Sequence, residues 1–291
     1  MIVAWQGWQI EAPDDWSPVK IEGDAQAGYL LMADLDRAKV GIRWQLQKGE
    51  KFDAKSAAAK VLREEVGELE AKKATPDALG DWVSPLLYRD NEPPGRDLWI
   101  AYSKITSRLF QVVYHAHQRD DVLRQKLLPT LVDGPLDDEL SWSVFELSCR
   151  TPAGMHLAKQ RLNAGDLSLS FEGPGRRVAT VRQIAPAKLA LARWPMARWM
   201  AEQAAWRGHE FKMVGEPDAT SEVQTQKVVR RRRFCWMFWL ARQFMVLARH
   251  DQAKNRLMVV DASDKKLARE IMQSTGWARM NELKTEGAKQ N

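Results

Sequence analysis

Residues 234–247 restrict the possible folds of this chain more than any other stretch, because they are apolar and rich in aromatic side chains almost throughout. The run is shorter than the roughly 20 apolar residues that a membrane span needs. It therefore predicts two buried strands that meet at a turn near Ala241-Arg242. Residues 98–102 and 109–113 have the same character and flank a polar turn. We expect these two strand pairs to be the centres of two copies of one domain.

Further matches along the chain also predict a repeat. Three large apolar residues near the N-terminus alternate with smaller or polar ones, as in a half-buried strand. Their matches lie 137 residues later: Trp5 with Trp142, Trp8 with Phe145, and Ile10 with Leu147. Turns that begin at Pro13 and at Pro152 follow, and late in each half we match Arg108-Leu109-Phe110 with Arg242-Gln243-Phe244. Matches that keep the same order in both halves indicate an internal duplication.

Within each copy we expect three strands, a helix, further strands and a short final helix. Apolar residues recur at helical spacing over residues 53–72. Trp199 and Met200 belong to a similar pattern over residues 195–208, and we interpret them as the core-facing side of a helix. The short final helices are expected at residues 122–131 and 265–274.

The two copies predict two domains joined by a short linker. The residues between them hold turn formers and an acidic run, which is typical of a linker. The last residues of the chain are mostly polar. The predicted divisions are residues 1–132 for the first repeat, 133–139 for the linker, 140–275 for the second repeat and 276–291 for a polar tail.

The recurring positions are a large first-strand residue, a proline-led turn that ends in a large apolar residue, and a late strand pair with Arg two residues before Phe. In the first copy they are Trp8, Pro13, Trp16, Trp99, Arg108, Phe110 and Val112, and in the second Phe145, Pro152, Met155, Trp236, Arg242, Phe244 and Val246. This pattern resembles that of the PsbP-like domains. Their α/β/α sandwich is shared by the extrinsic subunit of photosystem II, the nuclear Ran-binding release factor and bacterial domains of unknown function.

The resemblance covers most of residues 2–132 and 140–275. It implies an α+β fold of two tandem α/β/α sandwich domains, each with a mostly antiparallel sheet flanked by helices. Known members of the family mostly bind other proteins and are not enzymes, so the resemblance implies a protein-binding role here. It implies no site residue, because the matched positions are core and turn positions.

The charge of the chain is divided unevenly between its halves. Residues 1–139 hold 18 Lys and Arg against 24 Asp and Glu, a net charge of −6. Residues 140–291 hold the remaining 26 and 14, a net charge of +12. Such an asymmetry can steer an acidic partner, or it can attract the two halves to each other or to a neighbouring subunit.

Thirteen tryptophans predict cores built from large rings, although a few of them could line grooves. Cys149 and Cys235 both lie in strand-like segments and are expected to be buried, reduced thiols. The N-terminal residues have neither the basic region nor the apolar region of a signal peptide. We therefore expect a cytoplasmic protein that does not enter membranes.

Few residues suggest catalysis or metal binding. His115 and His117 lie two residues apart at the end of an expected strand, close to Asp120, and could begin a metal site. The second copy lacks this pair, so we interpret it as a solvated strand end. The chain has no Gly-x-Ser-x-Gly sequence, and the glycine-rich residues 173–177 lack the Gly-Lys-Ser/Thr of a phosphate loop. The sequence predicts no catalytic, cofactor or metal residue.

A basic cluster beside the apolar run is the strongest candidate for a binding site. Its members are Lys227, Arg230, Arg231, Arg232 and Arg233, with Arg176 and Arg177 from a neighbouring hairpin. Arginine forks suit carboxylates and phosphates, so this cluster could bind an acidic protein surface or a nucleic acid. It could instead be a solvated strand end that pairs with the acidic first half.

Together these features predict a non-enzymatic binding or adaptor protein whose basic second half engages an acidic protein. The alternatives are a ligand-binding or catalytic domain with a pocket lined by tryptophan, and a nucleic-acid binder. No cofactor is expected, and the sequence determines neither the partner nor the oligomeric state.

Overall fold

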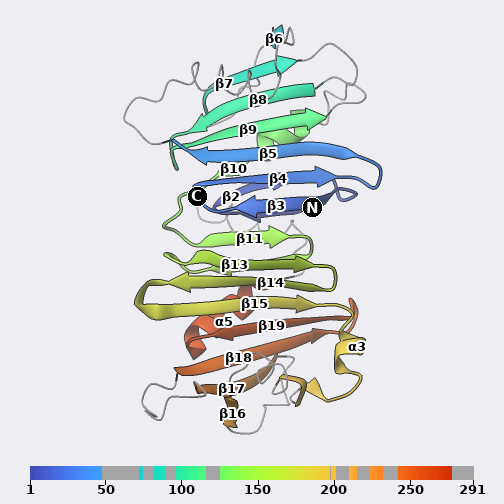
Figure 1. The fold of residues 1–291 in the computed structure, drawn as a ribbon, viewed down its shortest axis with the longest axis vertical. Helices are drawn as coiled ribbons and strands as arrows, with labels where there is room; N and C mark the ends of the chain where they lie inside the picture. Colours follow the sequence, from blue (N-terminus) through green and yellow to red (C-terminus); the bar gives the residue numbers. More distant parts are fainter. Residues whose placement is uncertain are drawn as a thin grey trace, which may run out of the picture. The chain divides into compact units, whose positions relative to one another are not determined.

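The structure, a computed structural model, describes residues 1–47, 72–74, 82–89, 96–115, 125–196, 198–200, 210–214, 223–231 and 242–276 (Figure 1). These residues form two compact units. Residues up to 137, together with 143–145, belong to the first unit. Residues 138–142 and those from 146 to 276 belong to the second.

A seven-stranded antiparallel sheet forms the body of the first unit. Its order is β3 (Ser17–Gly23), β4 (Ala27–Ala33), β5 (Ala38–Leu46), β9 (Arg108–His115), β8 (Arg96–Ser103), β7 (Trp82–Arg89) and β6 (Lys72–Ala74). The predicted strand pair of residues 98–102 and 109–113 is confirmed as part of β8 and β9. The central strand β9 is mostly buried, whereas β5 beside it alternates between buried and exposed residues from Ile42 to Gln45.

A sheet with the corresponding order forms the body of the second unit. Its order is β13 (His156–Asn163), β14 (Asp166–Gly173), β15 (Arg177–Ile184), β19 (Arg256–Ala262), β18 (Arg242–Asp251), β17 (Val223–Arg231) and β16 (Glu210–Val214). All neighbouring strands are again antiparallel. Matching the strands in chain order gives the same arrangement in both sheets, which is what an internal duplication predicts (Figure 1).

The predicted equivalence between residues 98–113 and 234–247 is wrong. In the second sheet the hairpin at the position of β8 and β9 is β18–β19. The counterpart of Arg108, the first residue of β9, is therefore Arg256 and not Arg242. A shared Arg-x-Phe sequence does not determine which strand follows the turn. Residues 234–241 lie outside the described residues, so the first strand predicted there is not tested.

Each unit also has a short N-terminal hairpin. In the first, β1 (Ile2–Trp5) and β2 (Trp8–Glu11) flank Gln6 and Gly7, whose φ angles of 49° and 83° are typical of a two-residue hairpin turn. β10 (Val132–Asp133) pairs with β2. In the second, β11 (Leu140–Val144) neighbours β12 (Leu147–Thr151).

The predicted match between Trp8 and Phe145 is also wrong. Trp8 is a fully buried residue of β2, whereas Phe145 is a half-buried turn residue with a φ of 54°. Leu147, the first residue of β12, lies at the position of Trp8. The error of two residues arose because both hairpins contain several large apolar residues.

Each unit has a hydroxyl side chain that accepts a hydrogen bond from the backbone of its N-terminal hairpin. Thr130 Oγ1 accepts a hydrogen bond from the backbone N–H of Glu11 at 2.8 Å. Ser274 Oγ accepts one from the backbone N–H of Arg150 at 2.9 Å. Each hydroxyl belongs to the last residue of a helical segment and bonds the last or next-to-last residue of the second hairpin strand. This recurrence is a second structural similarity between the units.

The proline-led turns recur as well. The N–H of Trp16 donates to the carbonyl of Pro13 at 3.2 Å, and the N–H of Met155 donates to the carbonyl of Pro152 at 3.3 Å. Trp16 and Met155 are both buried. The sequence match between these two turns is therefore confirmed.

The α/β/α sandwich expected from the PsbP-like resemblance is wrong. Antiparallel sheet dominates the described chain, whose helical segments include α3 (Ala187–Leu191), α5 (Lys265–Ser274) and the 3-10 turns η1 (Leu128–Thr130) and η2 (Pro174–Arg176). The resemblance depended on turn and first-strand positions, which antiparallel hairpins provide without layers of helices. Of the helix expected over residues 53–72, only Lys72 is described, and it begins β6.

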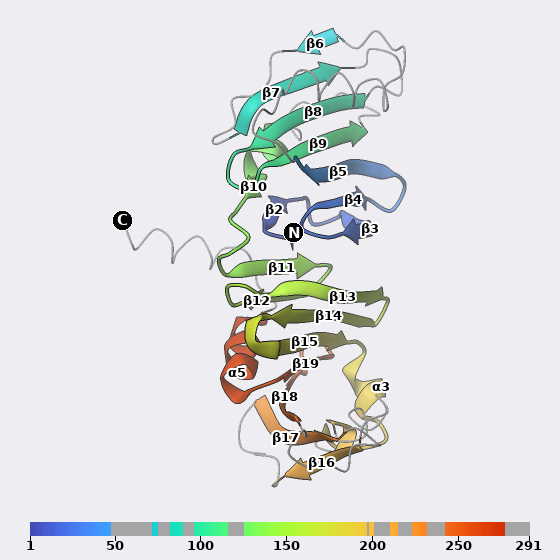
Figure 2. The same cartoon turned by 60° about the vertical axis from the view of Figure 1, so that its left-hand side comes forward.

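The expected final helix of the second unit is confirmed as α5. Its N-cap, Asp264, accepts a hydrogen bond from the N–H of Leu267 at 2.8 Å, as N-cap aspartates commonly do. α5 follows the end of β19, whereas α3 follows the end of β15. Because β15 and β19 are antiparallel, these two helices begin at opposite ends of the sheet (Figure 2).

Aromatic rings fill the core of the first unit. The ring centroid of Trp8 lies 5.3 Å from that of Trp44 and 6.2 Å from that of Phe110. Trp82 continues the cluster at 5.1 Å from Phe110 and 5.3 Å from Trp99. Distances and tilts of this kind favour aromatic contacts. The prediction of cores built from large rings is confirmed here.

Candidate functional site

The predicted basic residues of the second unit lie toward one end of its sheet. Across the strands, Ala179 of β15 is in line with Ala262 of β19, Met245 of β18 and Lys227 of β17. Arg177 lies two residues beyond this row at the start of β15. β17 is antiparallel to β15, so its later residues extend toward the same end.

Arg230 is thereby placed near the level of Arg177, although the two are far apart in the chain. Two strands, β19 and β18, separate β15 from β17. Three strand spacings of about 4.8 Å give a lateral separation of about 14 Å. The two groups therefore lie at the same end of one sheet without touching.

Neighbouring strands add charges to this end of the sheet. Arg230 lies opposite Arg242 of β18, and Arg231 lies opposite Glu210 of β16. Arg232 and Arg233 lie outside the described residues. Arg242 was not predicted as a binding residue, because the sequence analysis placed it in a turn between two buried strands.

Exposed side chains at the start of β15 and of α5 complete the surface. Arg176 is exposed and Arg177 is half-buried. Lys265 and Lys266, also exposed, begin α5 directly after β19 ends. We use the name sheet-end surface for Arg176, Arg177, Lys227, Arg230, Arg231, Arg242, Lys265 and Lys266.

Arg182, also on β15, does not add to this surface. Its Nε and Nη2 donate to the two carboxylate oxygens of Asp166 at 2.6 and 2.9 Å. Arg161 approaches the same carboxylate at 3.3 Å. A two-pronged contact of this kind already satisfies the guanidinium of Arg182.

A second basic feature, which the sequence analysis missed, surrounds Trp194. The guanidinium carbon of Arg193 lies 4.6 Å from the ring centroid of Trp194, and that of Arg198 lies 5.4 Å from it. Both distances are within the range of cation–π contacts. Both arginine side chains are exposed, whereas the ring is half-buried. We use the name tryptophan–arginine site for these three residues.

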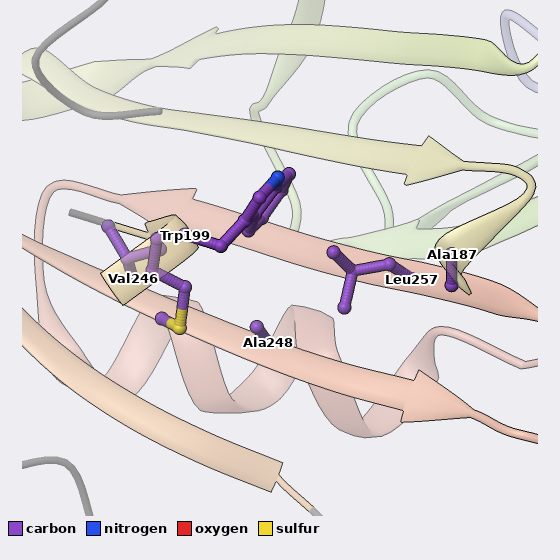
Figure 3. Packing of buried hydrophobic residues seen from close by; sticks show 6 residues of the cluster. Ala187, Trp199, Val246, Ala248 and Leu257 are labelled. Carbon is purple, nitrogen blue, oxygen red and sulfur yellow. The ribbon is translucent and has the colours of Figure 1, made fainter. Parts of the chain in front are cut away.

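Packing on the sheet holds this segment in place. Trp199 and Met200 are buried against Val246, Ala248 and Leu257, a cluster that includes Ala187 of α3 (Figure 3). The prediction that Trp199 and Met200 face the core is confirmed. The outward-facing residues of the segment are thus carried on a fixed support.

The sequence does contain a signal for this second site. Between Glu172 and Glu202 there is no Asp or Glu, while Lys and Arg recur through the stretch. Arginines on both sides of Trp194, at positions 193 and 198, allow two guanidiniums to reach one ring. The site was missed because the whole segment was interpreted as a core-facing helix, on the basis of Met196, Trp199 and Met200. The exposed residues between them were not considered.

Cys149 on β12 is not suited to nucleophilic chemistry. It is fully buried, and this burial raises the pKa of its thiol well above the usual value. The thiolate is the reactive form of cysteine, so a buried neutral thiol is inert. Cys235 lies outside the described residues.

Among the described residues, no three His, Cys, Asp or Glu side chains lie close enough together to hold a metal ion. His115 is the last residue of β9. His117 and Asp120, its predicted companions, are outside the described ranges.

In the described core of the first unit, Trp8 packs against Trp44, and Trp82 packs against Trp99. Trp5, Trp8, Trp44, Trp99 and Trp142 are among the largest fully buried side chains. A cavity beside Trp99 and Tyr114 has a volume of about 10 Å³. This is room for about one water molecule.

Within the part of the chain that the structure describes, no helix is long and apolar enough to cross a membrane.

Comparisons with known proteins do not assign this chain to a family. No protein-family profile matches it, and no curated protein matches it. A crystal structure from Bacteroides thetaiotaomicron is similar at 14% identity over 50% of each chain, with a TM-score of 0.30.

The immunity protein TplEi of the T6SS from Pseudomonas aeruginosa is similar over 94% of this chain and 96% of that chain. The apo form shares 11% identity with a TM-score of 0.33, and the complex with the "L" peptide shares 12% with a TM-score of 0.35. TM-scores of this size establish neither fold nor function.

Proposed function

We propose that this chain is a non-enzymatic binding protein whose sheet-end surface engages an acidic surface of a partner protein. The observation that supports this most directly is the strand register. It places the start of β15, with Arg177, near the level of Arg230 and Arg242 at one end of a single sheet.

The chemistry of this surface favours binding to carboxylates. Guanidinium groups match carboxylates in shape and can bind them through two parallel hydrogen bonds. Acidic residues at this end are fewer, and one of them, Asp264, already caps α5. Among the described side chains of this surface, those of Arg176, Lys265 and Lys266 are exposed.

The same chemistry supports a binding role over a catalytic one. Arginine remains protonated at all physiological pH values and cannot act as a general base. A lysine that is fully exposed to water is in general a poor nucleophile. A surface made of these groups can attract and orient an anion.

Nucleic acid is a second candidate ligand, because phosphates would also be attracted to this surface. Recognition of single strands, however, also uses exposed aromatic rings on which bases stack. Phe171 lies opposite Ala179 near this end of the sheet, and it is only 1% exposed. Phe171 therefore does not offer a free face to a base.

The test uses a labelled poly-L-glutamate chain and a labelled DNA duplex as probes, at about 0.1 M salt, where the Debye length is about 10 Å. We expect the double variant Arg177→Gln/Arg230→Gln to bind poly-L-glutamate about 10-fold more weakly, since each charge contributes about 0.7 kcal/mol. Lys126→Gln/Lys159→Gln removes two exposed charges elsewhere and serves as the matched control.

Equal losses of affinity for poly-L-glutamate in the test and control variants would show that the net charge of the protein, and not this surface, determines binding. Tighter binding of the duplex than of poly-L-glutamate, lost in the same double variant, would instead assign the surface to nucleic acid. Fluorescence anisotropy measures both probes.

A further inference from the structure

The tryptophan–arginine site has the features of a preorganised carboxylate-binding site. Arg193 and Arg198 lie 4.6 and 5.4 Å from the ring centroid of Trp194, and both are exposed. Neither makes an ion pair with another residue in the described part of the chain. Contact with the ring restricts each guanidinium before any ligand arrives, which lowers the entropy lost on binding.

An exposed apolar side chain lies in the same segment. Leu189 of α3 is 74% exposed, although its neighbour in the helix, Ala187, is fully buried. Leu189 precedes Trp194 by five residues, so their Cα atoms are at most about 18 Å apart. An extended peptide of six or more residues can span that distance.

α3 presents Leu189 from a fixed position. The backbone N–H groups of Ala187 and Lys188 donate to the backbone carbonyl and the side-chain oxygen of Asn255 at 2.7 and 2.8 Å. Asn255 belongs to the turn between β18 and β19, so the first turn of α3 is tied to the end of the sheet. An exposed leucine on a rigid support is a suitable contact for an apolar side chain.

We propose that the tryptophan–arginine site and Leu189 together dock an acidic polypeptide segment. Arg193 and Arg198 bind neighbouring carboxylates of the segment, and Leu189 packs against an apolar side chain between or beside them. Charge complementarity identifies the ligand as anionic, because no Asp or Glu occurs between Glu172 and Glu202.

A bilayer fits these residues less well. Helices that lie on membranes insert an apolar face over several turns. α3 has 5 residues, and Trp199 and Met200 are already buried against the sheet. A single exposed leucine between cationic groups matches one apolar side chain of a peptide better than it matches the acyl region of a membrane.

Nucleic acid also fits less well. Stacking on a base requires a free aromatic face. Trp194 is half-buried, and its ring already contacts the guanidiniums of Arg193 and Arg198. The ring therefore packs against side chains of its own chain.

This docking site is independent of the sheet-end surface. α3 follows the end of β15, and Arg177 is at the start of the same strand. Loss of binding through one surface therefore need not affect the other, and variants at each distinguish the two proposals.

The probe is a fluorescein-labelled peptide with the repeating sequence Glu-Glu-Leu, and a second peptide replaces each Leu with Ser. We expect Arg193→Lys/Arg198→Lys to weaken binding of the first peptide about 5-fold, because lysine keeps the charge but lacks the fork and its stacking. Arg193→Gln/Arg198→Gln should weaken it at least about 10-fold. The control Lys126→Gln/Lys159→Gln should change it less than about 2-fold.

The Leu189→Ser variant supplies the second measurement. It should weaken binding of the Leu-containing peptide about 5-fold, because an apolar contact worth about 1 kcal/mol is lost. Binding of the Ser-containing peptide should be unchanged, because that peptide has no leucine to make the contact. Circular dichroism confirms that each surface variant is folded.

Three results would overturn the proposal: no binding of the Leu-containing peptide by the original protein, unchanged binding by the lysine variant, or an equal effect of Leu189→Ser on both peptides. Vesicles of phosphatidylcholine and phosphatidylserine are measured in parallel. Vesicle binding that depends on Leu189, without peptide binding, would assign the site to a membrane surface.

Discussion

Arg108 and Arg256 occupy the same position in the two units. Each is the first residue of its strand, β9 or β19, and each side chain reaches the turn of the N-terminal hairpin in its own unit. Arg108 Nη1 donates to the carbonyl of Gln6 at 2.7 Å, and Arg256 forms an ion pair with Glu146. Burial lowers the pKa of both guanidiniums, yet the Arg108 side chain is 0% exposed and that of Arg256 is 18% exposed.

This difference predicts unequal costs for the same substitution. Arg108→Met leaves Asp133, a carboxylate that is 2% exposed, without its partner and should lower the free energy of unfolding by about 3–5 kcal/mol. Arg256→Met leaves Glu146, which is 59% exposed, in contact with water and should cost about 0–1 kcal/mol. Urea unfolding measures both values.

A double variant supplies the control for this comparison. Arg108→Met/Asp133→Leu removes both buried charges and should be more stable than Arg108→Met alone, because no uncompensated charge remains. Similar losses for Arg108→Met and Arg256→Met would contradict the expected role of burial.

Features set by local sequence were predictable. α5 has a capping aspartate and apolar residues at helical spacing, and the turns at Pro13 and Pro152 combine a proline with a large apolar residue. The β8–β9 hairpin combines two apolar runs with a polar turn. In these cases the interacting residues are close in the chain, so their pattern is sufficient.

Features set by strand register were not predictable. The counterpart of Arg108 and the position of Arg177 and Arg230 at the same end of the sheet depend on which strands pair and where, which no short segment determines. The tryptophan–arginine site was missed because Trp194 was counted as one of many core aromatic residues. The expected α/β/α sandwich was wrong because the resemblance was based on positions that an antiparallel sheet also provides.

A buried hydrogen bond between Trp142 and Thr151 should contribute to the stability of the second unit. The indole N–H of Trp142 donates to Thr151 Oγ1 at 2.9 Å, and Thr151 is 0% exposed. Thr151→Val keeps the shape but leaves the N–H without an acceptor, so it should lower the free energy of unfolding by about 1–3 kcal/mol.

Thr151→Ser retains the hydroxyl and loses one methyl group, so it should cost about 1 kcal/mol. Urea unfolding compares the two variants with the original protein. A valine variant as stable as the original protein would show that this hydrogen bond makes no net contribution.

Asp34 at the β4–β5 turn should make stability depend on pH. Its contact with Lys39 at 2.5 Å, followed by hydrogen bonds from the N–H groups of Asp36 and Arg37, lowers its pKa to about 2. The unfolded value is about 3.9. The folded pKa is the lower one, so the stabilisation is present above about pH 4 and is lost as the pH falls toward 2.

Asp34→Asn should therefore be less stable than the original protein at neutral pH, with a difference that shrinks toward pH 2. Urea unfolding at several pH values measures this difference. Lys39→Gln removes the largest cause and should raise the pKa of Asp34 toward its ordinary value, as followed by carboxyl NMR. A stability difference between Asp34→Asn and the original protein that stays constant with pH would contradict the lowered pKa of Asp34.

The thiol of Cys149 should be unreactive in the folded protein. It is buried, and burial raises its pKa, so almost no thiolate forms at pH 8. Alkylation by iodoacetamide should be at least about 100-fold slower than in urea, where the thiol is exposed and has its ordinary pKa of about 8.5. Peptide mapping by mass spectrometry separates labelling at Cys149 from labelling at Cys235, and the original protein in urea provides complete labelling as the reference. Rapid labelling of Cys149 in the folded protein at pH 8 would show that β12 opens readily and would contradict the expected protection.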